Sequence, residues 1–145
     1  MKEEIKLETL SVNHVTAPSD PFAQELISLF MERKLEGFAL CISVESELAA
    51  FVLVEHKTGS DMLINRGLFV DSKYRGKGLA KEMLSKLHLL PFFIWTNITE
   101  GSEKIYQHFE YKVVGERKEL KQSIAYYPNK YVTQEKINFL LGKVD

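Results

Sequence analysis

Apolar residues along the chain follow two spacings, and each spacing predicts one kind of secondary structure. Short runs of apolar and β-branched residues predict strands, because successive side chains of a strand face opposite sides of a sheet. Apolar residues that recur every three or four positions predict amphipathic helices. Strands are expected over residues 5–15, 38–44, 48–55, 62–70, 92–98, 111–116 and 123–127.

The first helix is expected after a turn at Ala17 to Asp20. Asp20 followed by Pro21 is typical of a helix start, since Asp caps free N–H groups and Pro suits the first helical position. The helix should run to about Leu35 and be closed by Gly37. Its predicted apolar face consists of Phe22, Leu26, Leu29 and Phe30.

Three further helices are expected. One begins near Gly78 and is stopped by Pro91, because proline lacks the N–H that a helix needs. A short helix over residues 100–109, capped by Thr99 or Ser102, and a last helix over residues 133–141 complete the set. The inner face of the helix near Gly78 is expected to consist of Leu79, Met83, Leu84 and Leu87.

The predicted order of elements is β–α–βββ–α–β–α–ββ, followed by the last helix. Three strands in succession, joined by short turns, indicate a meander with antiparallel pairing. We therefore expect an α/β (α+β) domain with a mixed, mostly antiparallel central sheet flanked by helices. No repeat or linker divides the chain, so residues 1–145 are expected to form a single domain.

Composition narrows the class of protein. The chain has 145 residues, 45% of them hydrophobic and 27% charged, with a formal net charge of −1. These values exclude a disordered chain, and the charge balance predicts no general attraction to nucleic acid or to an anionic membrane. The charged start of the chain lacks the apolar stretch of a signal peptide, and the longest nearly uncharged run, residues 87–98, is too short to span a bilayer. A cytoplasmic protein is expected.

The single cysteine, Cys41, is expected in the core, because it lies within an apolar strand and has no second cysteine for an internal disulfide. No metal is expected, since a cysteine-based zinc site would need more thiol ligands. His14, His88 and His108 are interpreted as structural or solvated residues.

The segment from Gly67 to Ala80, where a predicted strand leads into a helix, carries the most informative chemistry. Its glycines let a ligand approach the backbone, and the first turn of a helix leaves N–H groups unpaired, which favours anions. Between residues 73 and 86 the chain has a net charge of +4, from Lys73, Arg75, Lys77, Lys81 and Lys86 against Glu82. The alternative is a solvated helix start with an ordinary glycine turn.

Two common phosphate-binding loops do not fit this segment. A Walker loop needs Ser or Thr after its lysine, but Gly78 follows Lys77. A dinucleotide fingerprint needs a third glycine near Lys81 and a preceding parallel strand, whereas the strands here are expected to be antiparallel.

Within this segment, Val70 to Ala80 resembles motif A of the GNAT superfamily of acyl-CoA-dependent N-acyltransferases. That motif has Arg or Gln, two variable residues, Gly, one variable residue, and Gly or Ala, and Arg75, Gly78 and Ala80 match it. A second resemblance is Ile105-Tyr106 ahead of Phe109. The chain departs from the family pattern at Thr99, Ser102 and Glu110, where Asn, Ala and Gly are usual.

The resemblance implies a cleft for acetyl-CoA, as acyl-donor substrate, between the strands at residues 62–70 and 92–98. Pyrophosphate would bind the backbone amides of Arg75, Gly76, Lys77, Gly78, Leu79 and Ala80. Pantetheine would pair with the strand backbone at Leu68, Phe69 and Val70, and Asn97 would bind its amides. The side chains of Lys73 and Lys77 either contact phosphate or belong to a solvated face.

The resemblance also implies roles in catalysis. A backbone N–H near Val70 would stabilise the oxyanion, and Tyr106 would protonate the departing thiolate. The alternative for Tyr106 is a buried aromatic residue on the inner face of its helix. Glu55 and His56, at the end of the preceding strand, are candidate bases, and water alone is the other option.

The predicted function is acetyl-CoA-dependent N-acetyltransfer to a primary amine of a small molecule, peptide or protein by direct transfer. Two alternatives stay open: a non-catalytic acyl-CoA sensor of the same fold, and, less favoured, a phosphate-binding domain of another fold. The acceptor groove is expected between residues 22–35 and the last hairpin, where Arg33-Lys34 are interpreted as ordinary surface residues. The last helix packs on the domain or on a second copy, so a homodimer stays open.

Overall fold

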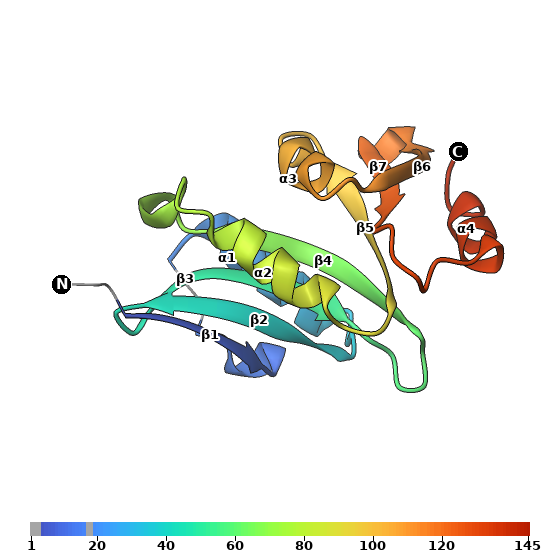
Figure 1. The fold of residues 1–145 in the computed structure, drawn as a ribbon. Helices are drawn as coiled ribbons and strands as arrows, with labels where there is room; N and C mark the ends of the chain where they lie inside the picture. The colour runs from blue at the N-terminus through green and yellow to red at the C-terminus, as the bar shows by residue number, and fades with distance from the viewer. Residues whose placement is uncertain (1–3, 17–18) are drawn as a thin grey trace.

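The computed structural model describes residues 4–16 and 19–145. Its strands are β1 (Ile5–Leu10), β2 (Gly37–Val44), β3 (Glu47–Glu55), β4 (Met62–Val70), β5 (Phe93–Thr99), β6 (Lys112–Arg117) and β7 (Gln122–Tyr126). Its α-helices are α1 (Pro21–Glu32), α2 (Leu79–His88), α3 (Glu103–His108) and α4 (Gln134–Leu141). Short 3₁₀ helices occur at Val12–His14, Ser72–Tyr74 and Lys118–Leu120. The predicted element order is confirmed (Figure 1).

All seven strands form one sheet in the order β1-β2-β3-β4-β5-β7-β6. Every neighbouring pair is antiparallel except β4 and β5, which run parallel. The parallel pairing is short, since it joins only Met62–Asn65 to Phe93–Thr96. Beyond it the two strands separate, and the sheet divides into the β1–β4 part and the β5–β7 part (Figure 1). The expected mixed, mostly antiparallel sheet is thus confirmed.

The helices cover both faces of this sheet. The face under α2 and α3 buries the predicted residues Leu79, Met83, Leu84 and Leu87. The other face packs against α1 near β2–β4 and against α4 near β5–β7. Cys41 lies in the core under α1 with 1% of its surface exposed, as predicted, and burial raises the pKa of its thiol to about 11.

The start of the chain differs from the prediction. The first strand ends at Leu10 and not at Val15, because residues 12–14 turn into a 3₁₀ helix. This turn buries Val12 and Val15 in the core under α1. Residues Ala17 and Pro18 of the predicted turn lie outside the described residues.

Helix α1 begins as predicted but ends early. The Asp20 carboxylate accepts hydrogen bonds from the Phe22 and Ala23 N–H groups at 2.8 and 3.1 Å. The helix stops at Glu32, and Lys34 reverses the chain with φ of 53°. Gly37 does not close the helix; it is the first residue of β2. A side chain at Gly37 would place its Cβ 1.8 Å from the Val54 carbonyl oxygen, so glycine is needed for strand packing.

The apolar face predicted for α1 is only partly buried. Phe30 is 3% exposed, but Phe22 and Leu29 are 55% and 46% exposed. The core contacts come from Ala23 and Phe30, with Leu26 and Ile27 at the margin. The two exposed apolar side chains therefore face something other than the core.

No helix in the described part of the chain is long and apolar enough to cross a membrane. Residues 4–16 and 19–145 also contain no group of three or more His, Cys, Asp or Glu side chains arranged to hold a metal ion.

Candidate active site

The separation of β4 and β5 leaves half of a strand with a free edge. From Gly67 to Val70, β4 pairs with β3 along one edge, from Leu53 to Ala50. Among the described residues no strand pairs with the other edge, since β5 pairs with β4 only up to Asn65. Unpaired strand N–H and C=O groups bind an extended ligand as an added strand.

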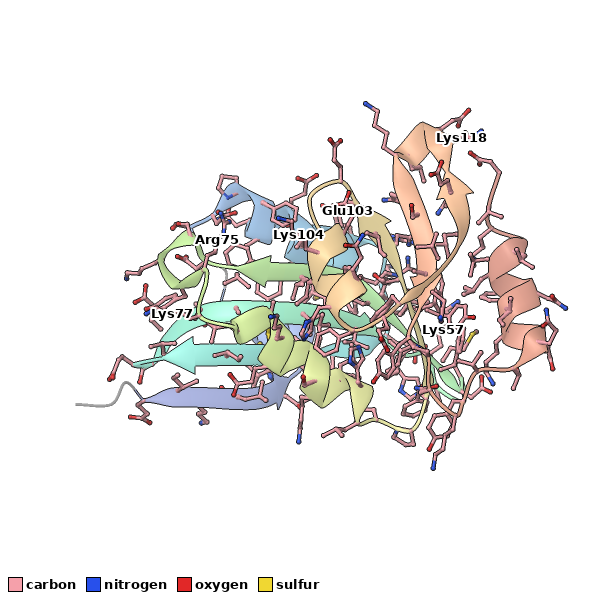
Figure 2. The ribbon with its side chains drawn as sticks, turned by 45° about the horizontal axis from the view of Figure 1, so that its top comes forward. Lys57, Arg75, Lys77, Glu103, Lys104 and Lys118 are labelled. Atoms are coloured by element: carbon pink, nitrogen blue, oxygen red, sulfur yellow. The ribbon has the colours of Figure 1, made fainter. Side chains whose placement is uncertain are left out.

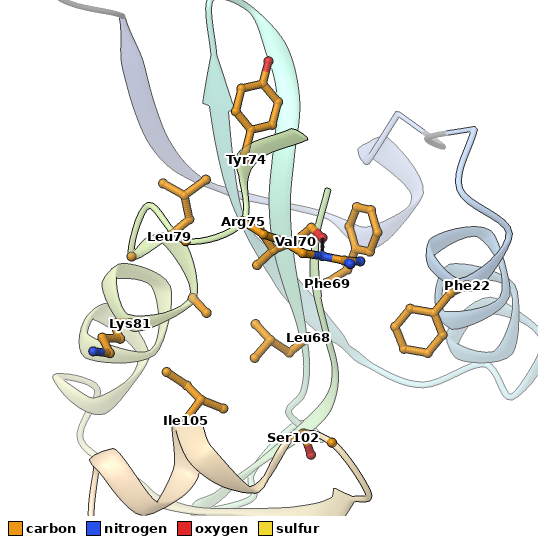
Figure 3. Close-up of a pocket in the computed structure, with 14 residues that line it drawn as sticks. Phe22, Leu68, Phe69, Val70, Tyr74, Arg75, Leu79, Lys81, Ser102 and Ile105 are labelled. Carbon is orange, nitrogen blue, oxygen red and sulfur yellow. Dashed lines mark hydrogen bonds between the residues drawn. The ribbon is translucent and has the colours of Figure 1, made fainter. Parts of the chain in front are cut away.

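A first cavity of about 410 Å³ lies along this free edge. It is lined by the predicted residues Leu68, Phe69, Val70, Arg75, Gly76, Gly78, Leu79 and Ala80. Figure 3 shows Leu68 of β4, Leu79 of α2 and Ile105 of α3 around this space, with Phe22 of α1 on the opposite side. Among the predicted donor-binding residues, Asn97 lines an adjoining cavity and Lys77 lines neither.

Two glycines shape the loop that closes one end of the first cavity. Gly76 and Gly78 have φ of 80° and 78°, in the left-handed region that side chains disfavour. A Cβ at either position would meet nothing within 4 Å, so the space beside the loop is open to a ligand. Gly78 also precedes α2 without a side chain to cap it, which leaves the first N–H groups of that helix for an anion.

The basic side chains of this loop have different surroundings. Arg75 lines the cavity and donates from Nε to the Val70 carbonyl oxygen at 3.1 Å. Lys73 instead contacts Glu47 at 3.2 Å, and their hydrogen bond lowers the pKa of the Glu47 carboxyl. Lys77 lies on the loop near Arg75 (Figure 2), with its Nζ 5.6 Å from the centre of the Tyr74 ring. Arg75 and Lys81 are thus the basic residues that line the first cavity.

A second cavity of about 710 Å³ adjoins the first, because Phe22, Leu68, Gly101 and Ser102 line both. Its wall includes residues of α1 and of the β6–β7 hairpin, the two regions predicted to build an acceptor groove. Tyr106 and Asn97 also line it. The two cavities together form a cleft that passes from the glycine loop to Tyr106.

Tyr106 lies at the base of the second cavity with 4% of its surface exposed. Its hydroxyl oxygen accepts a hydrogen bond from Asn65 Nδ2 at 2.9 Å. Burial raises the pKa of the Tyr106 phenol to about 12, against the opposing effect of hydrogen bonds with Thr96 and Asn65. The phenol is therefore protonated at neutral pH, and its hydroxyl is hydrogen-bonded to both Asn65 and Thr96.

Sequence analysis missed Asn65 and Thr96, which support this hydroxyl. The two residues are partners in the short parallel ladder, and Thr96 Oγ1 donates to the Asn65 carbonyl oxygen at 3.0 Å. Asn65 also accepts from the Gly67 N–H at 3.0 Å, so it connects the free edge of β4 to Tyr106. The signal was a polar residue within each of two apolar strands, at positions that are 4% and 2% exposed.

The two candidate bases do not line either cavity. Glu55 is 2% exposed and accepts a hydrogen bond from Arg66 Nε at 2.8 Å. His56 Nε2 lies 2.9 Å from the Ser60 carbonyl oxygen, within the β3–β4 turn. Both side chains have structural contacts, and neither is placed to take a proton from a ligand in the cleft.

The comparisons with known proteins agree with this geometry. Residues 4–88 match the family model of the acetyltransferase (GNAT) family. This chain belongs to the GNAT acetyltransferase family. The match includes the free strand edge and the glycine loop, and it ends at the last residue of α2, before Tyr106. A comparison with curated proteins finds no matching sequence.

Solved GNAT structures share the fold. The PaiA N-acetyltransferase of Thermoplasma acidophilum, in complex with coenzyme A, is 12% identical with a TM-score of 0.63, covering 87% of this chain and 99% of that one. The diaminobutyrate acetyltransferase EctA of Paenibacillus lautus, with L-2,4-diaminobutyric acid and coenzyme A, is 13% identical with a TM-score of 0.59, covering 89% and 99%. YhbS of Escherichia coli, with CoA, is 14% identical with a TM-score of 0.59, covering 88% and 83%.

Proposed function

We propose that this GNAT protein transfers an acetyl group from acetyl-CoA directly to a primary amine. The observation that carries the proposal is the free edge of β4, which runs from an open glycine loop toward the protonated hydroxyl of Tyr106. The coenzyme A in the solved structures of PaiA, EctA and YhbS, and the amine substrate in that of EctA, support this function.

The donor would lie along the first cavity. Backbone N–H groups from Arg75 to Ala80 would bind its pyrophosphate, and Arg75 and Lys81 would add positive charge. The pantetheine arm would extend β4 at Leu68, Phe69 and Val70 as an added strand, with Asn97 near its amides. This placement brings the thioester toward the second cavity.

Acyl transfer would then proceed in one covalent exchange. The neutral amine attacks the thioester carbonyl, a backbone N–H near Val70 stabilises the oxyanion, and the C–S bond breaks as the C–N bond becomes an amide. The amine nitrogen loses one proton to water, and the departing sulfur receives one from the Tyr106 hydroxyl. A thiol titrates near about 8.5, so the phenol is the weaker acid. The Tyr106 phenolate left behind is therefore the stronger base, and it regains a proton from water, which balances the proton that the amine lost.

Thermal unfolding with acetyl-CoA tests donor binding. Ligand at 100 times its dissociation constant stabilises the folded state by about 2.7 kcal/mol, which corresponds to several degrees for a chain of this size. Gly78→Val places a side chain in the open space beside the loop and should abolish this shift.

Gly59→Val is the matched control for Gly78→Val. Gly59 also has a left-handed φ, of 82°, and open space around it, but it lines neither cavity. Both variants therefore carry similar backbone strain, and only Gly78→Val should lose the response to acetyl-CoA. No shift in the wild type at millimolar acetyl-CoA, or an undiminished shift in Gly78→Val, contradicts the proposal. A shift with no turnover on any amine supports the sensor function instead.

A further inference from the structure

The second cavity has more positive than negative side chains around it. Three arginines line it, Arg33, Arg66 and Arg117, against one carboxylate, Glu100. They come from the end of α1, from β4 and from β6, so only the folded chain brings them together. The chain as a whole carries a net charge of −1, and this local excess is therefore a property of the cavity.

Arg66 is held in a fixed orientation at this cavity. Its Nε donates to Glu55 at 2.8 Å, and its guanidinium carbon lies 5.8 Å from the centre of the Trp95 ring. Glu55 is 2% exposed, whereas the Arg66 side chain is 21% exposed. Within the described part of the chain, the two Nη groups of Arg66 make no hydrogen bond. A guanidinium held in place with free donors is suited to bind a carboxylate, whose two oxygens match its planar geometry.

Arg33 and Arg117 add charge without an internal partner. Neither side chain forms an ion pair or a hydrogen bond with another described residue. Arg117 is half-buried at the end of β6, where an unpaired cation costs more free energy than on the open surface. An anionic group bound in the cavity would offset that cost.

Three exposed apolar side chains also line the second cavity. Phe22 and Leu29 of α1 and Leu120 of the β6–β7 hairpin are 55%, 46% and 52% exposed, and all three line this cavity. Phe22 and Leu29 belong to the apolar face that their helical spacing predicted for α1. Apolar side chains around a concave site favour a ligand with an apolar part, because its burial removes both surfaces from water.

We propose that the acceptor is a free α-amino acid with an apolar side chain, an inference that rests on the proposed acetyltransfer. Its carboxylate binds Arg66 and Arg117, with Arg33 nearby, and its side chain lies against Phe22, Leu29 and Leu120. The α-amine attacks the acetyl carbonyl and forms a C–N bond while the C–S bond breaks. One proton leaves the nitrogen for water and one reaches the sulfur, so the products are an N-acetylamino acid and CoA.

The test compares L-leucine with two analogues that lack its carboxylate, 3-methylbutylamine and L-leucinamide. Thiol release from acetyl-CoA gives kcat/KM for each, and we expect L-leucine to exceed both by at least about tenfold. The amine of leucinamide resembles a peptide α-amine, which titrates near about 8, so it is the better nucleophile at neutral pH when nothing recognises the carboxylate. Glycine, which retains the carboxylate but has no side chain, should also be poorer than leucine by about tenfold.

Substitutions of Arg117 and Arg66 test whether these side chains cause the preference for leucine. Arg117→Gln should raise KM for leucine about tenfold and leave KM for 3-methylbutylamine unchanged. Arg66→Gln alone would leave the buried Glu55 without its partner, so the double variant Glu55→Gln/Arg66→Gln is used. It should also raise KM for leucine and leave KM for 3-methylbutylamine unchanged. Lys118→Gln is the control, since Lys118 is an exposed cation on the same hairpin (Figure 2) that lines neither cavity.

The outcomes separate this inference from the proposed function. Equal turnover of leucine and the two analogues that lack the carboxylate, or a preference that survives both arginine variants, overturns the inference and leaves the acetyltransfer intact. Turnover of peptide α-amines in preference to leucine also overturns it. Binding of acetyl-CoA with no turnover of any amine contradicts the proposed function, and the inference fails with it.

Discussion

The two cavities of the cleft are built in different ways. The first is formed largely by consecutive residues, from Leu68 on β4 to Lys81 on α2, with a few side chains from α1 and α3. The second draws on α1, β4, β5, α3 and the β6–β7 hairpin, and no short stretch of the chain defines it. Under the proposed function, a local motif would suffice to bind the donor, which is the constant part of the reaction. Recognition of the acceptor would depend on how distant elements pack.

The comparison predicts that changes at the two cavities affect different measurements. Variants of the loop before α2 should change acetyl-CoA affinity, whereas variants around Tyr106 should change turnover at constant affinity.

Tyr106→Phe removes one hydroxyl from the second cavity and almost no volume. Turnover with a competent amine should fall roughly 10²- to 10⁴-fold, the usual contribution of a general acid, while the dissociation constant for acetyl-CoA stays the same. The measurements are thiol release and acetyl-CoA titration. Because the pKa of the phenol is about 12, the wild-type rate should rise with pH as the amine deprotonates, with no fall from Tyr106 ionisation below about pH 11.

Tyr111→Phe is the control for this variant. Tyr111 is also buried, with its ring 5.0 Å from that of Tyr106, but it lines neither cavity and its hydroxyl lies 2.8 Å from His88 Nε2. Its removal should leave turnover within a factor of a few. If Tyr106→Phe retains full turnover, or if both variants lose it equally, Tyr106 has only a packing role.

Asn65→Ala tests whether the second cavity depends on contacts between distant elements. The change removes the hydrogen bond to the Tyr106 hydroxyl and the one from the Gly67 N–H. Loss of one such hydrogen bond corresponds to about 1 kcal/mol, so kcat should fall roughly fivefold with little change in KM for acetyl-CoA.

Asn129→Ala provides the comparison, since the Asn129 side chain also makes two hydrogen bonds, to the Phe92 carbonyl oxygen and from the Tyr131 N–H, but lies outside both cavities. Both variants should lose stability, and only Asn65→Ala should lose kcat. A normal kcat in folded Asn65→Ala would show that Tyr106 is positioned without Asn65.

His88 joins the two parts of the molecule, and its protonation should weaken that junction. It ends α2, stacks on Tyr127 of the other part at 3.7 Å between ring centres, and lies 2.8 Å from the Tyr111 hydroxyl. Burial lowers its pKa to about 4, whereas an unfolded histidine titrates near about 6.5. The unfolded state therefore binds the proton more readily between these values. The contribution of the neutral His88 ring to the free energy of unfolding is complete above about pH 6.5 and is lost as the pH falls to about 4.

The loss should amount to roughly 1–3 kcal/mol, because the ring is only partly buried and solvent screens part of the effect. Urea unfolding at pH 7 and at pH 4.5 measures it. His88→Gln should lose less stability between these two pH values than the wild type. His108→Gln, at an exposed position on α3, should lose as much stability between the two pH values as the wild type does. An equal loss of stability in all three proteins would show that protonation of His88 does not cause it.

Much of the fold followed from local signals. Asp20 and Pro21 start α1 as expected, and the apolar residues of α2 are buried as their spacing predicts. The end of α1 was predicted too late because Gly37 is typical of a helix end. Its close approach to Val54, which places it in a strand instead, is a contact between residues far apart in the sequence.

The sequence by itself determined the glycine loop before α2, on the proposed donor side of the cleft. Conformation at Gly76 and Gly78 is local, since it depends on the absence of a Cβ, and the charge of the following helix is set by its own residues. These features and the strand before them identify the loop from its own residues, whatever the arrangement of the rest of the chain.

Only the tertiary structure decided the second cavity, the proposed acceptor side. Arg33, interpreted from the sequence as an ordinary surface residue, lines the same cavity as Arg66 and Arg117. Phe22 and Leu29, spaced as core residues, face that cavity as well. Helical spacing determines which residues share a face but not what that face meets, because the contact depends on how α1, β4 and the β6–β7 hairpin pack against one another.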